Sequence, residues 1–347
     1  MAKLKVAVLY DEWDGEAEER PGPGRGVRKR RKRGEPTEDI QEVFEALKKG
    51  GHSPFYIVLD GADETLLSLA RTEADLFFNL TESYRGDDTK DTNIAAYLDL
   101  LGRRYTGAGP EALYLAQDKP LAKKIFSFHG IATPFFATVY RGRLEHSQDI
   151  RFPLIVKPAR EDGSIGIEFS AVVNSIKELM ERIDALHMQF DSPVLLEEYV
   201  EGREIYAAIL GNEKPEALPL LEMDFSRLPD GTPRIAGTEV KWEKDTDFYK
   251  KTKTVYPDDL DDDAEETIKS TAIAAFQALK LRDYGRIDIR LDQKGTPHVL
   301  EVNPNPYLLP KAEFCLAGKK SGRAYGDLIC EIVELALARY QRPVLAL

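Results

Sequence analysis

The sequence predicts a doubly wound α/β domain followed by a larger α+β region. Strands and helices alternate over the first hundred residues, whereas later strands follow one another without full crossover helices between them. The chain has 347 residues, which favours two or three domains over one. Hydrophobic residues make up 42% of it and charged residues 31%, a balance that supports a buried core and is too polar for a membrane span.

The first domain is predicted at residues 1–110 and is expected to be Rossmann-like. Its first strand, KVAVLY (Lys5–Tyr10), is continuously apolar, as a central parallel strand is. The apolar stretch ends at Asp11 and is too short for a signal peptide, so we expect a cytoplasmic protein. A helix is predicted to follow Thr37 as its N-cap and to stop at Gly50. Further strands and helices are predicted in PFYIVLD, ETLLSLAR, ADLFFNL and TNIAAYLDLLG.

Two α+β subdomains are predicted at residues 111–200 and 201–347. The first contains the helix DKPLAKKIFSFHG, the strands FFATVY and FPLIVKPA, the helix SIKELMERIDALHMQF and the strand VLLEEYV. The second begins with the strand EIYAAILG and adds a long acidic helix (Asp261–Leu279), a hairpin and the final helix GDLICEIVELALARY. Strands that pair antiparallel around a few helices are typical of this class.

The distribution of charge and of metal-binding residue types excludes several kinds of site. Cys315 and Cys330 show neither metal spacing nor a disulfide framework, and the five histidines form no zinc motif, so any metal is expected to bind oxygen. The run RGVRKRRKR (Arg25–Arg33) is strongly basic in a chain whose net charge is −12. It is interpreted as a solvated loop or as a loop that recruits anions to an active site. Nucleic acid is a disfavoured partner, because no aromatic residues are interleaved and the rest of the chain is acidic.

The hairpin RIDIRLDQKGTPHVLEVNPNP places two carboxylates on neighbouring strands. With QKGT as a four-residue loop, three cross-strand pairs follow: Asp292 with Pro297, Asp288 with Glu301, and Arg286 with Asn303. These polar residues share one face, and the aliphatic residues, including Leu300 and Val302, line the other. Opposed like charges are destabilising, but a divalent cation between them reverses the sign, and two carboxylates with an amide oxygen suit Mg²⁺. The alternative is that Arg286 or Arg290 neutralises the pair.

The stretch LIVKPAREDGSIGI is interpreted as a phosphate-binding loop. An apolar strand ends at Lys157, and in the loop that follows Gly163 and Gly166 bracket Ser164 and Ile165. Glycines allow backbone N–H groups to converge on phosphate oxygens, and a nearby lysine adds a positive charge. No GK[ST] follows, so this is not a Walker loop, and an ordinary turn remains the alternative.

The stretch LLEEYVEGREIY offers three carboxylates, those of Glu197, Glu198 and Glu204. They are interpreted either as part of an exposed acidic strand or as acceptors, together with backbone groups, for an adenine amino group and ribose hydroxyls.

In these motifs the sequence resembles the ATP-grasp ligases, and among them the branch of D-alanine–D-alanine ligase. The resemblance runs from about FFNLTES onward and is carried by YTGAGPEALYLAQDKPLAKKIFSFHGI, PLIVKPAREDGSIGI, LLEEYVEGREIYAAIL and YGRIDIRLDQKGTPHVLEVNPNP, in this order. It implies an ATP-grasp fold in which the 111–200 subdomain is a lid and ATP lies between it and the 201–347 subdomain. It also implies an ATP-dependent carboxylate–amine ligase. In such an enzyme a carboxylate attacks the γ-phosphate to give an acylphosphate and ADP, and an amine then displaces phosphate.

The resemblance also implies roles for individual residues. The implied ATP-binding residues are Lys119, Lys157, Gly163, Ser164, Ile165, Gly166, Glu197, Glu198, Val200 and Glu204, with Glu197 on the adenine side and Glu204 at the ribose. The implied ligands of Mg²⁺, or of Mn²⁺ in its place, are Asp288, Glu301 and Asn303. Arg286 would stabilise the tetrahedral intermediate, and Lys251, or one of its neighbours Lys250 and Lys253, would close over the phosphates.

Several segments depart from the pattern of D-alanine–D-alanine ligases. The stretch LYDEWDGEAEERPGPGRGVRKRRKR stands in place of a Gly-Gly-x-Ser segment and a glutamate, and TESYRGDD replaces an HG pair. Tyr307 and Ala312 stand where glycine and serine are usual, Gly163 where the first of two serines is usual, and Thr252 where a tyrosine is usual. The sequence therefore predicts an intact ATP half and a rewritten amino-acid half.

We expect a ligase for amino acids or peptides other than two D-alanines, with acidic substrates among those that the basic run could recruit. The alternatives are a true D-alanine–D-alanine ligase, a kinase-like enzyme and a non-catalytic nucleotide-binding protein. The resemblance also suggests a homodimer.

Overall fold

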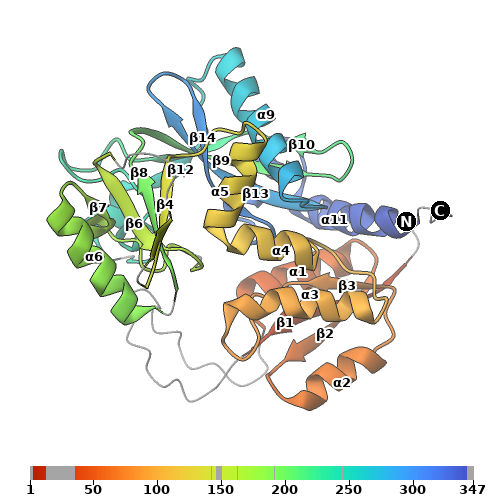
Figure 1. Ribbon diagram of the computed structural model, residues 1–347. Coiled ribbons are helices and arrows are strands. Elements are labelled where there is room, and N and C mark those ends of the chain that lie inside the picture. The colour runs from red at the N-terminus through yellow and green to blue at the C-terminus, as the bar shows by residue number, and fades with distance from the viewer. Residues whose placement is uncertain are drawn as a thin grey trace.

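The computed structural model describes residues 3–12, 36–141, 143–145, 151–161, 163–190, 192–243 and 245–341. The basic run Arg25–Arg33 lies outside the described residues. Three sheets form the framework (Figure 1): a first sheet of three strands, a lid sheet of five and a central sheet of six. Each of the three predicted ranges, 1–110, 111–200 and 201–347, holds one of these sheets. In the part of the chain that the structure describes, no helix is long and apolar enough to cross a membrane.

The first sheet is parallel and has the order β2-β1-β3. Its strands are β1 (Lys5–Asp11), β2 (Ser53–Leu59) and β3 (Leu76–Asn79). Helix α1 (Glu38–Lys49) packs Val43 and Leu47 into one core with Val6 and Val8, whereas α2 (Asp63–Arg71) and α3 (Asp91–Leu100) belong to the core on the other face. Because helices cover both faces of a parallel sheet, this part of the chain is doubly wound, as predicted.

The lid sheet is antiparallel and has the order β5-β4-β8-β6-β7. Its strands are β4 (Phe136–Tyr140), β5 (Arg143–Glu145), β6 (Leu154–Pro158), β7 (Val172–Val173) and β8 (Val194–Glu198). Helix α6 (Ile176–Gln189) buries Leu179, Ile183 and Leu186 against it. The short helices η1 (Asp88–Lys90) and η2 (Phe169–Ala171), with α4 (Pro110–Gln117) and α5 (Lys119–Phe128), complete this half of the chain.

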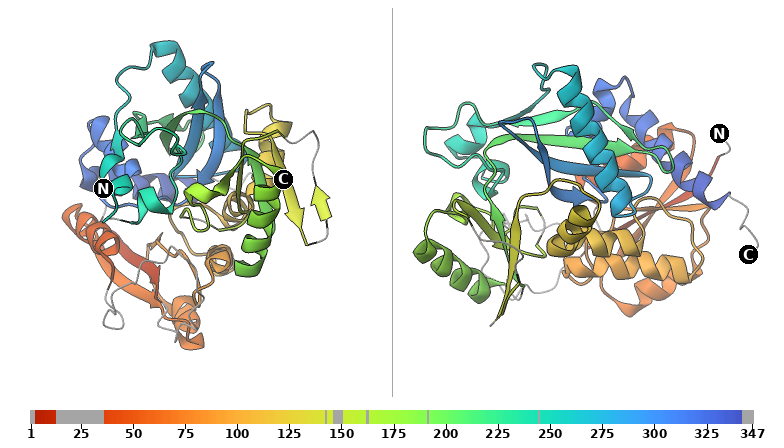
Figure 2. Two further views of the ribbon diagram at one scale, coloured as in Figure 1. Left: turned by 90° about the vertical axis from the view of Figure 1, so that its left-hand side faces the viewer. Right: turned by 45° about the horizontal axis from the view of Figure 1, so that its top comes forward.

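The central sheet has the order β12-β11-β9-β13-β14, and β10 pairs with β9. Its strands are β9 (Gly202–Leu210), β10 (Glu216–Ala217), β11 (Leu221–Asp224), β12 (Lys253–Val255), β13 (Tyr284–Asp292) and β14 (Pro297–Asn303). Helix α9 (Asp262–Ala278) lies across one face (Figure 2), and Asp261 caps it by accepting the Ala264 N–H at 2.7 Å. The remaining helices are α7 (Thr238–Lys241), α8 (Asp247–Lys251), α10 (Glu313–Lys320) and α11 (Tyr325–Tyr340).

The register of the β13–β14 hairpin is confirmed where the carboxylates lie and is wrong near the loop. Asp288 pairs with Glu301 and Arg286 with Asn303, but Leu291, not Asp292, pairs with Pro297. The cause is a bulge opposite Asp288 and Ile289 that leaves Leu300 without a partner in the ladder. Because of this extra residue, Val299 and Val302 both enter the core, although strict alternation places them on opposite faces.

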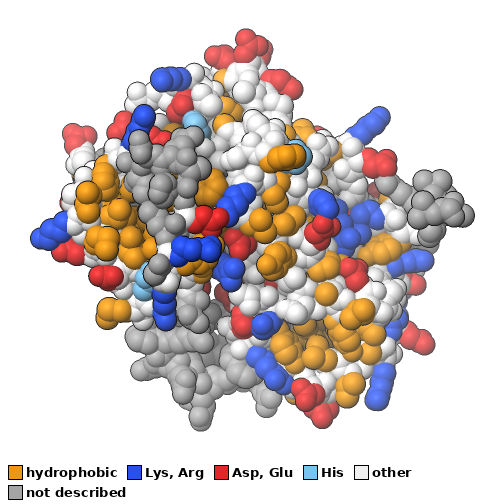
Figure 3. All heavy atoms as spheres, in the orientation of Figure 1, with side chains coloured by type: hydrophobic (Ala, Val, Ile, Leu, Met, Phe, Trp, Pro, Cys, Tyr) orange, Lys and Arg blue, Asp and Glu red, His pale blue; other side chains and the backbone are white. Residues whose placement is uncertain are grey.

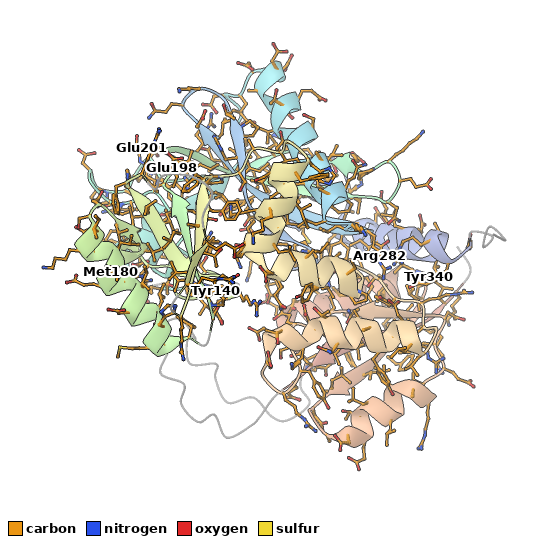
Figure 4. All side chains as sticks on the ribbon, in the orientation of Figure 1. Tyr140, Met180, Glu198, Glu201, Arg282 and Tyr340 are labelled. Atoms are coloured by element: carbon orange, nitrogen blue, oxygen red, sulfur yellow. The ribbon has the colours of Figure 1, made fainter. Side chains whose placement is uncertain are left out.

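Asp283 connects the segment after β3 to helix α11 through hydrogen bonds. Its carboxylate accepts two hydrogen bonds from Arg339 and one from the Gly107 N–H, each at 2.8 Å. Arg282, labelled in Figure 4, donates to the Gly107 carbonyl and stacks over the ring of Tyr105, whose N–H donates to the Tyr340 hydroxyl at 3.2 Å. Asp283 is fully buried, so the hydrogen bond from Gly107 joins the first domain to the segment before β13 inside the protein, and the ion pair with Arg339 adds α11 to this junction.

We predict that Asp283→Asn lowers the free energy of unfolding by about 3 kcal/mol, because it leaves the Arg339 guanidinium without its buried partner. Asparagine tolerates the positive φ of 64° at this position, so backbone strain contributes little. Urea denaturation measures the loss. The control is Asp258→Asn, at an exposed ion pair, which should change stability by less than about 0.5 kcal/mol. Equal effects of the two substitutions would contradict the assignment.

Candidate active site

Two lysines form ion pairs with one carboxylate of the lid sheet. Glu197, on β8, lies with Oε1 2.8 Å from Lys123 Nζ and with Oε2 2.7 Å from Lys157 Nζ. Lys157 is near the end of β6, which pairs with β8, and Lys123 comes from α5. The side chains of Glu197 and Lys123 are each 1% exposed, so these charges interact with little screening by water.

Burial and charge act in opposite directions on this cluster. Burial alone would raise the pKa of Glu197, but the positive charges of Lys123 and Lys157 outweigh it and lower the pKa to about 2. Burial lowers the pKa of Lys123 to about 8, although the charge of Glu197 opposes the shift. Glu197 is therefore ionised at neutral pH, and the positively charged side chains of Lys123 and Lys157 lie beside it.

The predicted metal ligands lie together at one end of the central sheet. Asp288 and Glu301 face each other across β13 and β14, and Asn303 is two residues beyond Glu301 on the same strand. Their two carboxylates and one amide oxygen fit Mg²⁺, and the Asn303 Nδ2 atom is buried without a hydrogen-bond partner among the described residues. Within the same part of the chain, no cluster of three or more His, Cys, Asp or Glu side chains could hold a metal ion.

Arg286 binds Asp288 through two hydrogen bonds, from Nε at 2.7 Å and from Nη2 at 2.9 Å. Its Nη1 donates to Glu313, at the start of α10, at 3.2 Å. Burial raises the pKa of Asp288, and the charge of Arg286 opposes that shift. In the alternative interpretation of the hairpin, an arginine neutralises the two carboxylates. In this structure that is true of Asp288, whereas Glu301 forms no ion pair with a described residue.

Glu301 instead interacts at longer range with the positive charges of several lysine side chains. Burial would raise its pKa, but the charges of Lys119, Lys157 and Lys241 lower it. These lysines belong to α5, β6 and α7, so three separate segments direct positive charge at the end of β14. Lys119 is buried and donates to the Glu161 carbonyl at 2.7 Å.

Glu204 lies on the same face, farther along the central sheet. It pairs with Arg290 across β9 and β13, with Arg290 Nη2 2.8 Å from Glu204 Oε2. The Tyr206 hydroxyl donates to Glu204 Oε1 at 3.0 Å, and the Tyr206 ring lies 5.2 Å from the Arg286 guanidinium. Glu204, predicted at the ribose, thus belongs to a row of polar side chains that continues to Asp288.

The phosphate loop is tightly turned. Gly163, Ser164 and Gly166 all have positive φ, and a Cβ on Gly166 would lie 2.7 Å from Pro158 at the end of β6. Glycine is therefore required at 166 both for its backbone conformation and for its close approach to the strand.

A second segment, residues 236–242, is bonded to this loop. Ser164 Oγ donates to the Ala236 carbonyl, the Thr238 N–H to the Ile167 carbonyl and Trp242 Nε1 to the Gly163 carbonyl, each at 2.8 Å. The Phe169 N–H donates to Glu239 at 2.8 Å. These bonds join the lid to the segment that carries Lys241.

Lys241 is one of the residues near the site that the sequence interpretation missed. Its charge shifts the pKa of both Asp288 and Glu301. Lys251 instead lies 3.8 Å from Asp247 on the half-exposed helix α8, Lys250 donates to the Asp245 carbonyl, and Lys253 is exposed. No sequence pattern marks Lys241, because α7 has only four residues and the lysine stands alone in it.

The structure brings together some, but not all, of the predicted site residues. Lys119, Lys157, Glu197, Arg286, Asp288, Glu301 and Asn303 converge as described above. Glu198 is exposed near Glu201 at one end of the lid sheet (Figure 4), and its N–H donates to the Phe135 carbonyl. Val200 is partly buried just beyond β8. On the face shown in Figure 3, basic and acidic side chains gather at the centre, between apolar patches over the lid and over the first domain.

Comparisons with known proteins bear on the family and the fold of the chain. A family model described as D-ala D-ala ligase C-terminus matches residues 125–334. Similar proteins include a D-alanine--D-alanine ligase from Bordetella petrii, 32% identical over 82% of this chain and 83% of that protein. An uncharacterised protein, y4sG, from Sinorhizobium fredii is 32% identical over 86% of this chain and 87% of its own. The crystal structure of D-alanine--D-alanine ligase from Bacillus anthracis complexed with ATP covers 97% of this chain and 98% of its own, with a TM-score of 0.68 at 20% identity, which confirms the predicted ATP-grasp fold.

We predict that Glu197→Gln destabilises the protein at neutral pH and that the effect disappears in acid. A carboxyl group whose pKa is lowered on folding stabilises the native state above its ordinary pKa of about 4.5, and this contribution is lost as the pH falls toward 2. The difference in unfolding free energy between wild type and variant should shrink as the pH falls below about 5. Urea denaturation at several pH values measures it, and a difference that does not change with pH would contradict the ionised state of Glu197.

Proposed function

Since this chain belongs to the D-alanine–D-alanine ligase family and is an ATP-dependent carboxylate–amine ligase, we propose that it activates an amino acid or peptide carboxylate as an acylphosphate at the Asp288–Glu301 face. The observation that carries the proposal is that the charges of Lys119, Lys157 and Lys241 all act on Glu301, and that Lys241 lies in the segment bonded to the glycine-containing loop. A triphosphate brings several negative charges, and this arrangement supplies the positive charges that balance them.

The reaction needs no protein nucleophile. An oxygen of the substrate carboxylate attacks the γ-phosphorus, the bond to ADP breaks, and an acylphosphate forms. The nitrogen of an amine then attacks the acyl carbon, phosphate leaves, and the amine loses a proton as the amide forms. Lysine and arginine side chains would stabilise the charge that develops in both steps, and Arg286, which is bonded to Asp288, would stabilise the oxyanion of the second.

Asp288, Glu301 and Asn303 would hold Mg²⁺, and Mn²⁺ would suit the same oxygen ligands. When bound there, the ion spreads the negative charge of the transferring phosphate. Arg286 would then exchange part of its contact with Asp288, since both compete for the same carboxylate oxygens.

We assign the closing lysine to Lys241 in place of Lys251. Trp242 anchors the segment beside it to Gly163, so that Lys241 and the phosphate loop would close over the nucleotide together. Trp242, which follows Lys241, would then take the place of the tyrosine that usually follows this lysine, a place first assigned to Thr252.

The substrates are proposed to differ from two D-alanines. Burial, together with the charges of the nearby Asp39 on α1 and of Glu82, raises the pKa of Tyr307 well above the ordinary value. Asp11, at the end of β1, accepts hydrogen bonds from the Glu82 N–H and from Ser83 Oγ, at 2.7 and 2.6 Å. The segment TESYRGDD is thus fastened to β1 by contacts of its own, next to a tyrosine in the acceptor-side segment.

We predict ADP and phosphate release from ATP when amino acids or short peptides are supplied in pairs, with the amide product identified by mass spectrometry. Hydroxylamine, a nucleophilic amine, should trap the acylphosphate as a hydroxamate without an acceptor. Glu301→Gln should lower turnover by at least about 100-fold, with the melting temperature retained. ADP without free phosphate would indicate a kinase, and D-alanine as the preferred donor and acceptor would identify a D-alanine–D-alanine ligase.

We predict that Lys241→Met lowers kcat by about 100-fold or more, because it removes a charge that faces the transferring phosphate. Lys251→Met is the matched control and should change kcat by less than about 3-fold, since Lys251 contacts only the nearby Asp247 among the described residues. Steady-state ADP release measures both variants. A larger loss in Lys251→Met would return the role to the residue predicted from sequence.

A further inference from the structure

Lys123 is a buried lysine for which the proposed reaction has no use. It lies on α5 one turn after Lys119, and its side chain is 1% exposed. Burying an ammonium group is costly unless it is paired and hydrogen-bonded, so its position requires an explanation.

Every hydrogen of this ammonium group has an oxygen within reach. Lys123 Nζ lies 2.8 Å from Glu197 Oε1, donates to Thr133 Oγ1 at 2.7 Å and lies 3.5 Å from the Val299 carbonyl. Thr133 Oγ1 itself donates to Val299 at 2.8 Å, so Lys123 is fixed between β8, β14 and the segment before β4. It therefore cannot turn toward a ligand without breaking this network.

Lys157 is held differently. Among the described residues its Nζ contacts one oxygen, Glu197 Oε2, and its side chain is 7% exposed, against 1% for Lys123. Its charge reaches Glu301, where the phosphates are proposed to lie. If Glu197 had only Lys157 as its partner, turning that ammonium toward a phosphate would leave a buried carboxylate uncompensated.

We propose that Lys123 is a positioning residue that acts as the permanent counter-ion of Glu197 and thereby frees Lys157 to bind the phosphates of the nucleotide. Two lysines share one carboxylate, so the group of three carries one surplus positive charge, and the geometry assigns that surplus to Lys157. This inference rests on the proposed function, because it takes the phosphate-binding role of Lys157 as given.

The test compares the binding of ADP, with Mg²⁺, and of adenosine to the full chain by calorimetry. The ratio of the two dissociation constants isolates the contribution of the phosphates. Lys123→Met should weaken ADP binding by about 10-fold or more, as expected for loss of a hydrogen bond to a charged group, and change adenosine binding far less. Lys124→Met is the matched control and should leave both dissociation constants unchanged. Lys124 is on the same helix as Lys123, but it is exposed and forms an ion pair with Glu145 of β5.

The decisive variant is the double substitution Lys123→Met with Glu197→Gln. It removes the carboxylate that would otherwise retain Lys157, so the ratio of the ADP and adenosine dissociation constants should return to within about 3-fold of its wild-type value. Any contact of Glu197 with adenine is lost for both ligands and cancels in this ratio. If Lys123→Met unfolds the chain, Lys123→Gln replaces it, because it keeps donors for Glu197 and Thr133 without the charge.

Equal weakening of ADP and adenosine by Lys123→Met, or no recovery in the double variant, would overturn the proposal and assign Lys123 a structural role alone. Failure of the wild-type chain to bind ADP would instead overturn the proposed function, so the two failures are distinguishable.

Discussion

The structure depends on a concentration of buried and partly buried charge at one end of the central sheet. Asp288 and Glu301 face each other there, and like charges in that position repel. They are tolerated because Arg286 binds Asp288 directly, while Lys119, Lys157 and Lys241 act on Glu301 from three other segments. The lid sheet, the α7 segment and the hairpin must therefore come together for any of these charges to be compensated, and charge balance helps to fix their relative positions.

The two segments over this face are coupled as well. Hydrogen bonds from Ser164, Thr238 and Trp242 join the phosphate loop to residues 236–242, about seventy positions later in the chain. Most of these bonds use backbone carbonyls as acceptors, so the coupling depends on the path of the main chain more than on the side chains of the loop. Movement of the lid would carry Lys241 with it.

The sequence was sufficient for the elements whose pattern is local. The apolar run of β1, the long acidic helix α9 and the pairing of Asp288 with Glu301 all follow from periodicity and turn length. The bulge at Leu300 could not be predicted, because three aliphatic residues in four positions are compatible with either register, and only packing against α9 decides which of them enter the core. Lys241 and Lys123 were missed for a related reason. Each acquires its partners from strands far away in sequence, although the four-residue spacing of Lys119 and Lys123 on one helix face was a visible signal.

The position of α11 has a consequence for the order of assembly. Ile329, Ile332 and Val333 of this helix share one core with Val6, Val8 and Val43, so the last described helix covers a face of the first sheet. Until residues 325–340 have left the ribosome, α1 covers that face without α11, and the core that the two helices share is incomplete. The N-terminal domain therefore completes this core only after most of the chain has been synthesised, and the apolar surface that α11 later covers stays exposed to holdase chaperones until then.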